Sequence, residues 1–368
     1  MNGRGRLLRL LPTAVALVAA AVLPAAPLTA PVAADCPAAD PSGAVQAGEL
    51  TAPVAARACS LGGVTVVDGG LAVRVPDRDG EAVTAAASGP GRHPAMLTVV
   101  RMAGTVHARI WRPDGGPLGA PHAPFSRFGR ADGQPAEQPT EQPAGPPTGP
   151  TVESTRTPPV VAPPAVPKTV RCSDGAGAWL GTKWPAPYRW TLRLSGMPAY
   201  LGAPGPVRDA IRAAGDAVDG GRNDCGFTGG LALSQRYTGE TDRDAGVRAD
   251  GTCGDRDDRN VVAFGPLDGG LLALTCLWWT RGRTVEADIR ISDAPGTFTL
   301  DPTVGCTGSW DLEGTLTHEF GHVFGLGHVS YAEHGDLTMS DGLPACSAGF
   351  RSLGLGDYQT LRDQYGPG

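Results

Sequence analysis

Apolar positions in residues 169–368 recur with two periods, one typical of strands and one of helices. Polar and apolar residues alternate in 189–194 and again in 284–291, where Val285, Ala287 and Ile289 share one face. Alternation of this kind predicts a half-buried strand. With the short apolar runs added, the region is expected to contain strands at residues 189–194, 231–237, 260–264, 271–279 and 284–291.

Three helices are expected in the same region. Pro206 suits the first turn of a helix, apolar residues follow it at helical spacing, and Gly220 ends it. A second helix should begin near Asp311, and a third should occupy residues 357–365. Strands and helices in this order predict an α+β domain with a mostly parallel twisted sheet.

The N-terminal part of the chain has a different pattern. Residues 35–130 contain short apolar runs separated by Gly, Pro and Asp, which predict a small β-rich module. Residues 131–168 are rich in proline and polar residues and poor in aromatic ones, so they are expected to form an extended linker. The module could be a propeptide, an accessory binding module or a spacer, and its sequence does not choose among them.

The first residues resemble a signal for export. Arginines at positions 4, 6 and 9 precede an alanine-rich apolar stretch, and small residues end at Ala34. We therefore expect a signal peptide at residues 1–34, a secreted extracellular protein, and no membrane association after cleavage. An uncleaved membrane anchor is the alternative, but three prolines interrupt the apolar stretch.

Composition argues against a nucleic-acid-binding protein and indicates that the cysteines form disulfides. The net charge is −6 with 18% charged residues, and there is no basic tract of the kind that binds nucleic acid. Eight cysteines in an exported chain indicate disulfides. Two lie before the linker and six after it, so pairing within each region is expected, with fifteen connectivities open for the six.

The segment 318–328, His-Glu-Phe-Gly-His-Val-Phe-Gly-Leu-Gly-His, carries the candidate chemistry. On a helix, His318 and His322 project from one face and could hold one metal ion. Gly325 can adopt a left-handed conformation, end the helix and return His328 to the same metal. Glu319 would then reach a metal-bound water. Three imidazoles and one open position are typical of a catalytic zinc. The alternative is a core helix that carries histidines by chance.

This segment resembles the zinc motif of the metzincins, with Met339 placed as their Met-turn. Within that group the chain is most similar to the bacterial matrixin-type metalloproteases. Residues 311–317 resemble the approach to the first ligand, 286–289 the strand before the active-site helix, and 353–366 the final helix. The resemblance covers about residues 170–366 and nothing before the linker.

The resemblance implies a metzincin fold for residues 169–368 and hydrolysis of peptide bonds in a polypeptide substrate by a monomer. By position, His318, His322 and His328 would hold one catalytic Zn²⁺, Glu319 would be the general base, and Met339 would lie beneath the metal. Residues 271–279 would be the edge strand that pairs with an extended substrate.

Several departures from the family pattern matter. His334 is the only other histidine after the linker, so no second, structural zinc is expected. Asp341 replaces the tyrosine ligand of astacins and serralysins. Calcium is common in matrixins, and six aspartates crowd residues 242–258, but no spacing there matches a calcium loop, so a solvated acidic loop is favoured. Cys172 could be a degenerate cysteine switch, although a disulfide is favoured.

Two rival functions remain. The chain could be a non-catalytic secreted binding protein on a metzincin scaffold, but Glu319 and all three histidines are retained. Alternatively, the main function could reside in residues 35–130, with the peptidase as a processing device. The segment 340–346, after the Met-turn, does not indicate a cleavage preference.

Overall fold

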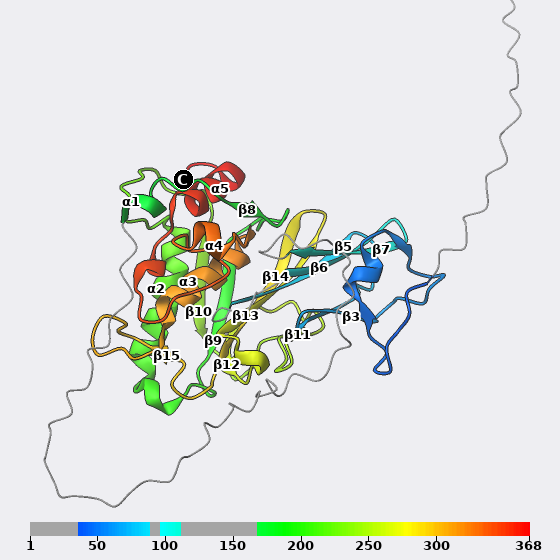
Figure 1. The fold of residues 1–368 in the computed structure, drawn as a ribbon, viewed down its shortest axis with the longest axis horizontal. Coiled ribbons are helices and arrows are strands. Elements are labelled where there is room, and N and C mark those ends of the chain that lie inside the picture. The colour runs from blue at the N-terminus through cyan, green and yellow to red at the C-terminus, as the bar shows by residue number, and fades with distance from the viewer. Residues whose placement is uncertain (1–35, 89–95, 112–167) are drawn as a thin grey trace, which may run out of the picture. The chain divides into compact units, whose positions relative to one another are not determined.

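A nine-stranded sheet organises the computed structural model, which describes residues 36–88, 96–111 and 168–368 (Figure 1). The predicted signal peptide and residues 131–167 of the predicted linker lie outside the described residues. In order across the sheet, the strands are β10 (Gln235–Glu240), β9 (Tyr188–Arg193), β12 (Val261–Gly265), β14 (Arg283–Ser292), β13 (Ala273–Thr280), β5 (Glu81–Ser88), β6 (Met96–Met102), β7 (Thr105–Trp111) and β2 (Val54–Ala55).

Smaller elements surround this sheet. A four-stranded sheet consists of β1 (Val45–Gln46), β3 (Thr65–Asp68), β4 (Leu71–Arg74) and β11 (Thr252–Cys253). Two strand pairs are β15 (Phe298–Thr299) with β16 (Trp310–Asp311), and β8 (Ala178–Trp179) with β17 (Leu326–Gly327). The α-helices are α1 (Lys168–Arg171), α2 (Pro204–Asp219), α3 (Leu312–Val323), α4 (Tyr331–His334) and α5 (Leu355–Tyr365). Short 3₁₀ helices are η1 (Ala47–Leu50), η2 (Ala199–Leu201), η3 (Asp268–Gly270) and η4 (Gly349–Arg351).

The α+β class is confirmed, and the strands of the large sheet that come from residues 169–368 pair mostly in parallel, as expected, but strands from the N-terminal part of the chain make the whole sheet mixed. Strands β10, β9, β12 and β14 are parallel, whereas every pair from β14 through β13 and β5 to β2 is antiparallel. Two-residue turns explain part of this mixture. Arg281 and Gly282 join β13 to β14 with φ of 52° and 73°, and Ala103 and Gly104 join β6 to β7 with φ of 51° and 76°. Such turns connect antiparallel neighbours.

Strand β13 is not an edge strand, which corrects the expectation for residues 271–279. One side of β13 pairs with β14, and the other pairs with β5 from Ala273 opposite Ser88 to Thr280 opposite Glu81. Strand β5 comes from the N-terminal part of the chain. Residues Cys36–Gly368 group into one compact unit. The domain division at the linker stays a prediction.

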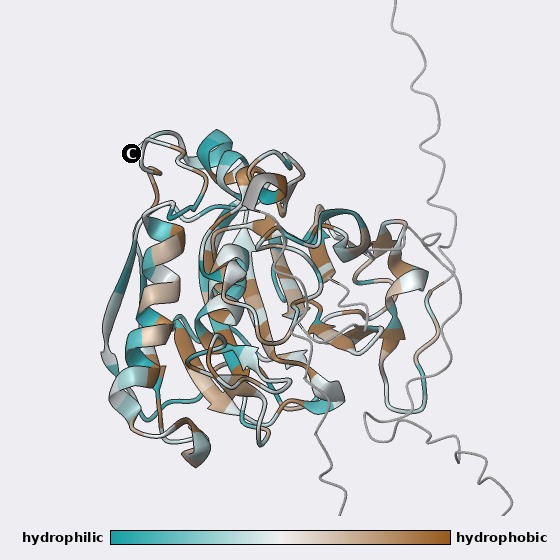
Figure 2. Ribbon diagram, turned by 60° about the vertical axis from the view of Figure 1, so that its left-hand side comes forward, coloured by the Kyte–Doolittle hydropathy of each residue, from teal (hydrophilic) through white to brown (hydrophobic). Residues whose placement is uncertain are grey.

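Both faces of the large sheet are covered by apolar cores. Along β12, Val262 and Phe264 face a core shared with α2, α3 and α5, while Val261 and Ala263 face a second core shared with the N-terminal strands. Figure 2 shows hydrophobic residues on the strands that lie between these two cores. Because both faces are covered, β14 is buried on both sides over most of its length, rather than half-buried as its alternation predicts.

Four disulfides link the cysteines: Cys36–Cys59, Cys172–Cys225, Cys253–Cys276 and Cys306–Cys346. Pairing within each region is therefore confirmed. Cys172 is bonded to Cys225, as the disulfide interpretation predicts, so its thiol is not available to a metal. No helix in the described part of the chain is long and apolar enough to cross a membrane.

Candidate metal centre

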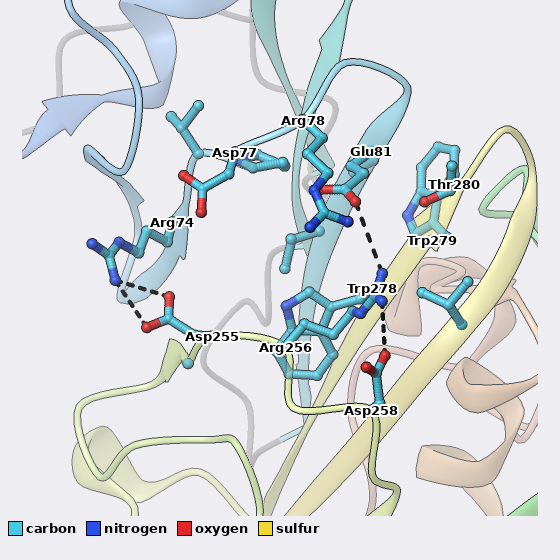
Figure 3. Close-up of a pocket in the computed structure, with 16 residues that line it drawn as sticks. Arg74, Asp77, Arg78, Glu81, Asp255, Arg256, Asp258, Trp278, Trp279 and Thr280 are labelled. Atoms are coloured by element: carbon cyan, nitrogen blue, oxygen red, sulfur yellow. Dashed lines mark hydrogen bonds and ion pairs between the residues drawn. The ribbon is translucent and has the colours of Figure 1, made fainter.

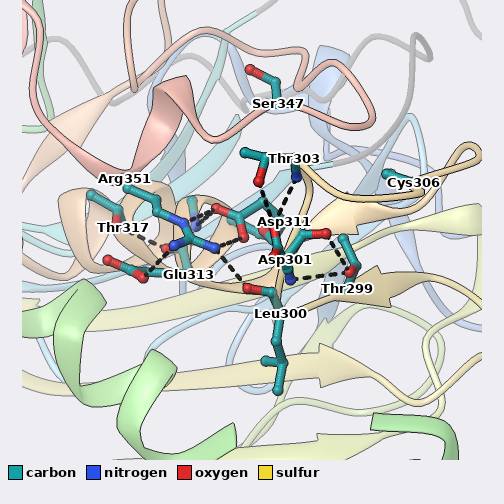
Figure 4. Close-up of polar contacts among 12 residues, drawn as sticks. Thr299, Leu300, Asp301, Thr303, Cys306, Asp311, Glu313, Thr317, Ser347 and Arg351 are labelled. Atoms are coloured by element: carbon teal, nitrogen blue, oxygen red, sulfur yellow. Dashed lines mark hydrogen bonds and ion pairs between the residues drawn. The ribbon is translucent and has the colours of Figure 1, made fainter. Parts of the chain in front are cut away.

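Helix α3 carries the first two histidines, and its start is fixed by charged groups (Figure 4). Asp311 is the N-cap, and its carboxylate accepts a hydrogen bond of 2.9 Å from the amide of Gly314. Arg351 donates two hydrogen bonds to the same carboxylate, of 2.7 and 2.6 Å, and a third of 2.9 Å to the carbonyl of Leu300. A bidentate pair of this kind fixes direction as well as distance. The helix therefore begins where the sequence predicts.

The three histidines of the motif meet at one point. The Nε2 atoms of His318, His322 and His328 form a triangle in which each pair is 3.0 Å apart. Ligand atoms about 2.0–2.1 Å from a tetrahedral zinc lie about 3.3 Å from one another. The triangle therefore has nearly the size that one metal ion requires. Among the described residues, this is the one group of three or more His, Cys, Asp or Glu that could hold a metal.

Gly325 makes the turn that brings His328 back to the helix. Its φ is +90°, the left-handed conformation expected from the sequence. A Cβ at this position would lie 2.6 Å from the ring of Trp179 and would also overlap the carbonyl oxygen of Thr182. The chain can follow this path only because residue 325 has no side chain. The next two residues form β17, which pairs with β8.

Backbone carbonyls orient two of the rings. His318 donates from Nδ1 to the carbonyl of Thr338 at 2.7 Å, and His322 donates from Nδ1 to the carbonyl of Leu326 at 2.9 Å. With Nδ1 as the donor, the lone pair of Nε2 points into the triangle. Burial lowers the pKa of His318 to about 4 and also lowers the pKa values of His322 and His328 well below the usual value for histidine. The imidazoles are therefore neutral at pH 7, the form that binds metal.

Met339 and Asp357 contact the segments that position the histidines. Met339 is buried and packs against Gly321, the residue before His322 on α3, where a Cβ would overlap its sulfur. The carboxylate of Asp357 on α5 accepts hydrogen bonds from the amides of Thr338 and Met339, at 2.8 and 3.3 Å. It thereby holds the turn whose Thr338 carbonyl orients His318.

Glu319 directly follows His318 on α3, and its carboxyl group is held by two hydroxyl groups. Ser88 of β5 donates to its Oε1 at 2.5 Å, and Thr275 of β13 donates to its Oε2 at 2.5 Å. Burial raises the pKa of Glu319 to about 7, although the two hydroxyls act in the opposite direction. A carboxyl group with this pKa can both accept and donate a proton near neutral pH.

Three of these supporting residues escaped the sequence interpretation. Ser88 and Thr275 lie in strands far from the motif, and only the β5–β13 pairing brings them to Glu319. Asp357 was recognised as part of a family-like segment, but nothing in its sequence context indicated that it accepts from the Met-turn amides. The one signal that could have identified Asp357 is the general tendency of a buried carboxylate to accept hydrogen bonds from backbone amides.

Five of the six aspartates in residues 242–258 are paired with arginines or backbone amides. Asp244 contacts Arg193 and Arg290, at 2.9 and 3.0 Å, and Asp255 contacts Arg74 at 2.8 Å. Beneath this loop, Asp288 accepts from the amides of Gly246 and Val261, and Glu286 accepts from the amides of Asp257 and Asp258. The loop is thus tied to the polar side of β14.

The site combines a metal-sized triangle of neutral imidazoles with an adjacent carboxyl group held by two hydroxyls. A divalent metal that accepts three nitrogen ligands fits this donor set. No family model matches the chain, and no curated protein matches it, so its relationship to known proteins rests on the motif and on this geometry.

Proposed function

We propose that this chain is a secreted zinc-dependent endopeptidase of the metzincin type, most similar to the bacterial matrixin-type enzymes. The observation that carries the proposal is the triangle of three Nε2 atoms, each 3.0 Å from the others, beside the buried carboxyl group of Glu319. Met339, packed against Gly321 beneath the histidines, adds support. The four disulfides support export to an oxidising compartment.

His318, His322 and His328 would hold the zinc, and the fourth position would remain open. When bound, zinc supplies a Lewis acid that polarises the scissile carbonyl and lowers the pKa of water towards about 7. Glu319 accepts the proton of the attacking water and returns it to the amine nitrogen as the peptide bond breaks. Thr275 orients this carboxyl group through its 2.5 Å hydrogen bond. The substrate is a polypeptide, and the enzyme acts as a monomer.

Replacement of Glu319 tests the assignment of the base. Glu319→Ala should keep its zinc and lose at least a hundredfold in hydrolysis of a casein substrate, because general base catalysis contributes about 10²–10⁴-fold. Glu333→Ala is the matched control, since Glu333 lies on α4 with an exposed side chain. Hydrolysis by both variants is measured in the full chain, before and after a specific protease has cut it between residues 150 and 151. Undiminished hydrolysis by zinc-loaded Glu319→Ala would refute the role of this carboxyl group.

Metal content tests the ligands separately from activity. His328→Ala should lose most of its bound zinc, whereas His334→Ala should retain it, because the His334 ring contacts Asp174 at 2.9 Å and lies outside the triangle. Equal zinc content in the two variants would show that His328 is not a ligand.

A second candidate is a metal-binding protein without catalytic activity. One observation favours it: His318, Glu319, His322 and His328 are each at most 1% exposed, and a hydroxyl of the same chain contacts Glu319. Zinc binding without chelator-sensitive hydrolysis, in both the intact and the cut chain, would support this candidate over the peptidase.

A further inference from the structure

Strand β5 lies on the edge of β13 that a bound peptide would otherwise use. The strands β10, β9, β12, β14 and β13 all come from the part of the chain after residue 168, and β13 would be their outermost strand without β5. An extended peptide adds to such an edge through backbone hydrogen bonds. Strand β5 pairs with β13 along all eight residues of each strand, from Ser88–Ala273 to Glu81–Thr280. A substrate could not pair with β13 while β5 is in place.

The end of β5 reaches the candidate base. Ser88 is the last residue of the strand, its side chain is 1% exposed, and its hydroxyl contacts Glu319 at 2.5 Å. The carbonyl of Ser88 also accepts a 2.8 Å hydrogen bond from the amide of Leu272, which fixes the strand end beside β13. Both carboxyl oxygens of Glu319 therefore already accept a hydrogen bond from a hydroxyl of the same chain, and the donor to Oε1 belongs to the N-terminal segment.

We propose that residues 36–111 inhibit the candidate site of the same chain. Strand β5 occupies the edge of β13 with which a substrate would pair, and the hydroxyl group of Ser88 binds the carboxyl group of Glu319. This inference rests on the proposed function and adds its regulation. The chain becomes active when this N-terminal segment leaves β13, and an extended polypeptide then takes the place of β5.

The side chains of β5 suit an occupant that is held by its backbone. Val83, Ala85 and Ala87 face the second core, so the opposite face of the strand carries Ala82, Thr84, Ala86 and Ser88. These four side chains are small, and β5 makes contacts with α3 as well as with β13. Small side chains allow the strand to lie close to the site without filling any pocket that a substrate side chain would need.

Disulfides leave the inhibitor free to separate once the chain is cut. Cys36–Cys59 lies within residues 36–111, and the other three disulfides lie within residues 168–368. Residues 112–167 contain no cysteine, so they are the only covalent connection between the two parts. Cys253–Cys276 also joins β11 to β13, the two strands on which the N-terminal segment docks. The docking platform is thus secured without the inhibitor.

One end of the docked interface is polar and open to solvent (Figure 3). A cavity of about 280 Å³ lies there between residues 74–83 and the segments 254–258 and 278–280. Two ion pairs cross the interface there: Arg74 contacts Asp255 at 2.8 Å, and Arg256 contacts Glu81 at 3.8 Å. Ion pairs of this exposure are screened by salt. Added salt should therefore favour release of the N-terminal segment.

The test uses the full chain with a specific cleavage site inserted between Pro150 and Thr151. Hydrolysis per molecule is measured before and after cleavage, over serial dilution and at two salt concentrations. The intact chain should show low activity that does not change with dilution. The cut chain should gain at least tenfold on dilution, and added salt should shift this gain to higher protein concentration. Equal activity of cut and intact chains at every dilution, with both sensitive to Glu319→Ala, would overturn the proposal.

Hydrogen exchange of the β13 amides separates this proposal from the proposed function. Alternate amides of β13 face β14 and should stay protected throughout. The β13 amides that face β5 should be protected in the intact chain and should exchange after cleavage and dilution, whether or not zinc is bound. If they do so while no sample hydrolyses casein, the edge is occupied reversibly and the peptidase assignment fails. If they stay protected after cleavage and dilution, β5 is a permanent part of the sheet and the proposal fails, whatever the activity.

Ser88→Ala tests the contact with the base. A hydrogen bond to a charged group is worth about tenfold or more in binding, so the cut Ser88→Ala chain should release its N-terminal segment at about tenfold higher concentration. Ser60→Ala is the matched control, because Ser60 lies in the same segment and is exposed. Release of the N-terminal segment at the same protein concentration in both variants would show that the Ser88–Glu319 contact contributes nothing to inhibition.

Discussion

Replacement of Gly325 by alanine should damage both the fold and the metal centre. A residue with a Cβ at the φ of +90° found here costs about 1–2 kcal/mol. The new methyl group would also lie 2.6 and 2.7 Å from ring carbons of Trp179 and overlap the carbonyl of Thr182. Overpacking of this kind costs about 1–3 kcal/mol. We expect a total loss of about 2–5 kcal/mol in the free energy of unfolding.

Gly181→Ala supplies the matched control for this prediction. Gly181 has nearly the same φ, +87°, but a Cβ there would meet open space, so only the conformational cost of about 1–2 kcal/mol applies. Urea unfolding of the chelated variants, followed by tryptophan fluorescence, gives the two losses. Zinc competition titration should show weaker binding for Gly325→Ala alone, because His328 follows the displaced turn. Equal losses of stability and equal zinc affinities would refute the packing argument.

Further predictions concern groups that support the site. Burial raises the pKa of Glu286 from 4.5 to about 7, so the folded chain binds this proton more tightly than the unfolded chain. The resulting stability is complete below pH 4.5 and is lost as pH rises through 7. The loss in the free energy of unfolding is about 2 kcal/mol after allowance for solvent screening. Glu286→Gln should flatten this loss, as measured by urea unfolding between pH 5 and pH 8. Asp357→Asn should destabilise the chain by about 2 kcal/mol and weaken zinc binding, because the amides of Thr338 and Met339 lose a charged acceptor and Arg171 loses a nearby negative charge. Replacing Cys172 and Cys225 by serine should cost up to about 4 kcal/mol for a separation of 53 residues. This replacement should not raise the activity of the intact chain; a gain would support a cysteine switch.

Features encoded within a few residues could be predicted from the sequence. The i, i+4 spacing of His318 and His322, the cap at Asp311 and the turn at Gly325 depend on local geometry, and the structure has all three. Even pairing of cysteines within each region follows from the redox compartment and the count. These local features were sufficient to locate the candidate metal centre.

Features that depend on distant partners could not be predicted. Strand β5, Glu-Ala-Val-Thr-Ala-Ala-Ala-Ser, was missed because alanine has low β-propensity and the strand is specified by its pairing with β13. The resemblance to the matrixins implies an edge position for β13 because it covers nothing before the linker, where β5 lies. Burial of Glu286 and Asp288 was equally hidden, because their partners are backbone amides of the loop that covers β14 and of Val261 at the start of β12. The missing information was the tertiary pairing of β5 with β13, which places β5 over the candidate site.

Zinc-edge X-ray absorption on the purified, zinc-loaded chain would show whether the three histidines bind one metal ion. We expect one zinc per chain, coordinated by three imidazole nitrogens and one further light atom at about 2.0–2.1 Å. His328→Ala should remove one imidazole from that set, and His334→Ala should leave it unchanged. A chain that binds no zinc, or one whose zinc has sulfur ligands or an unchanged imidazole count in His328→Ala, would contradict the account.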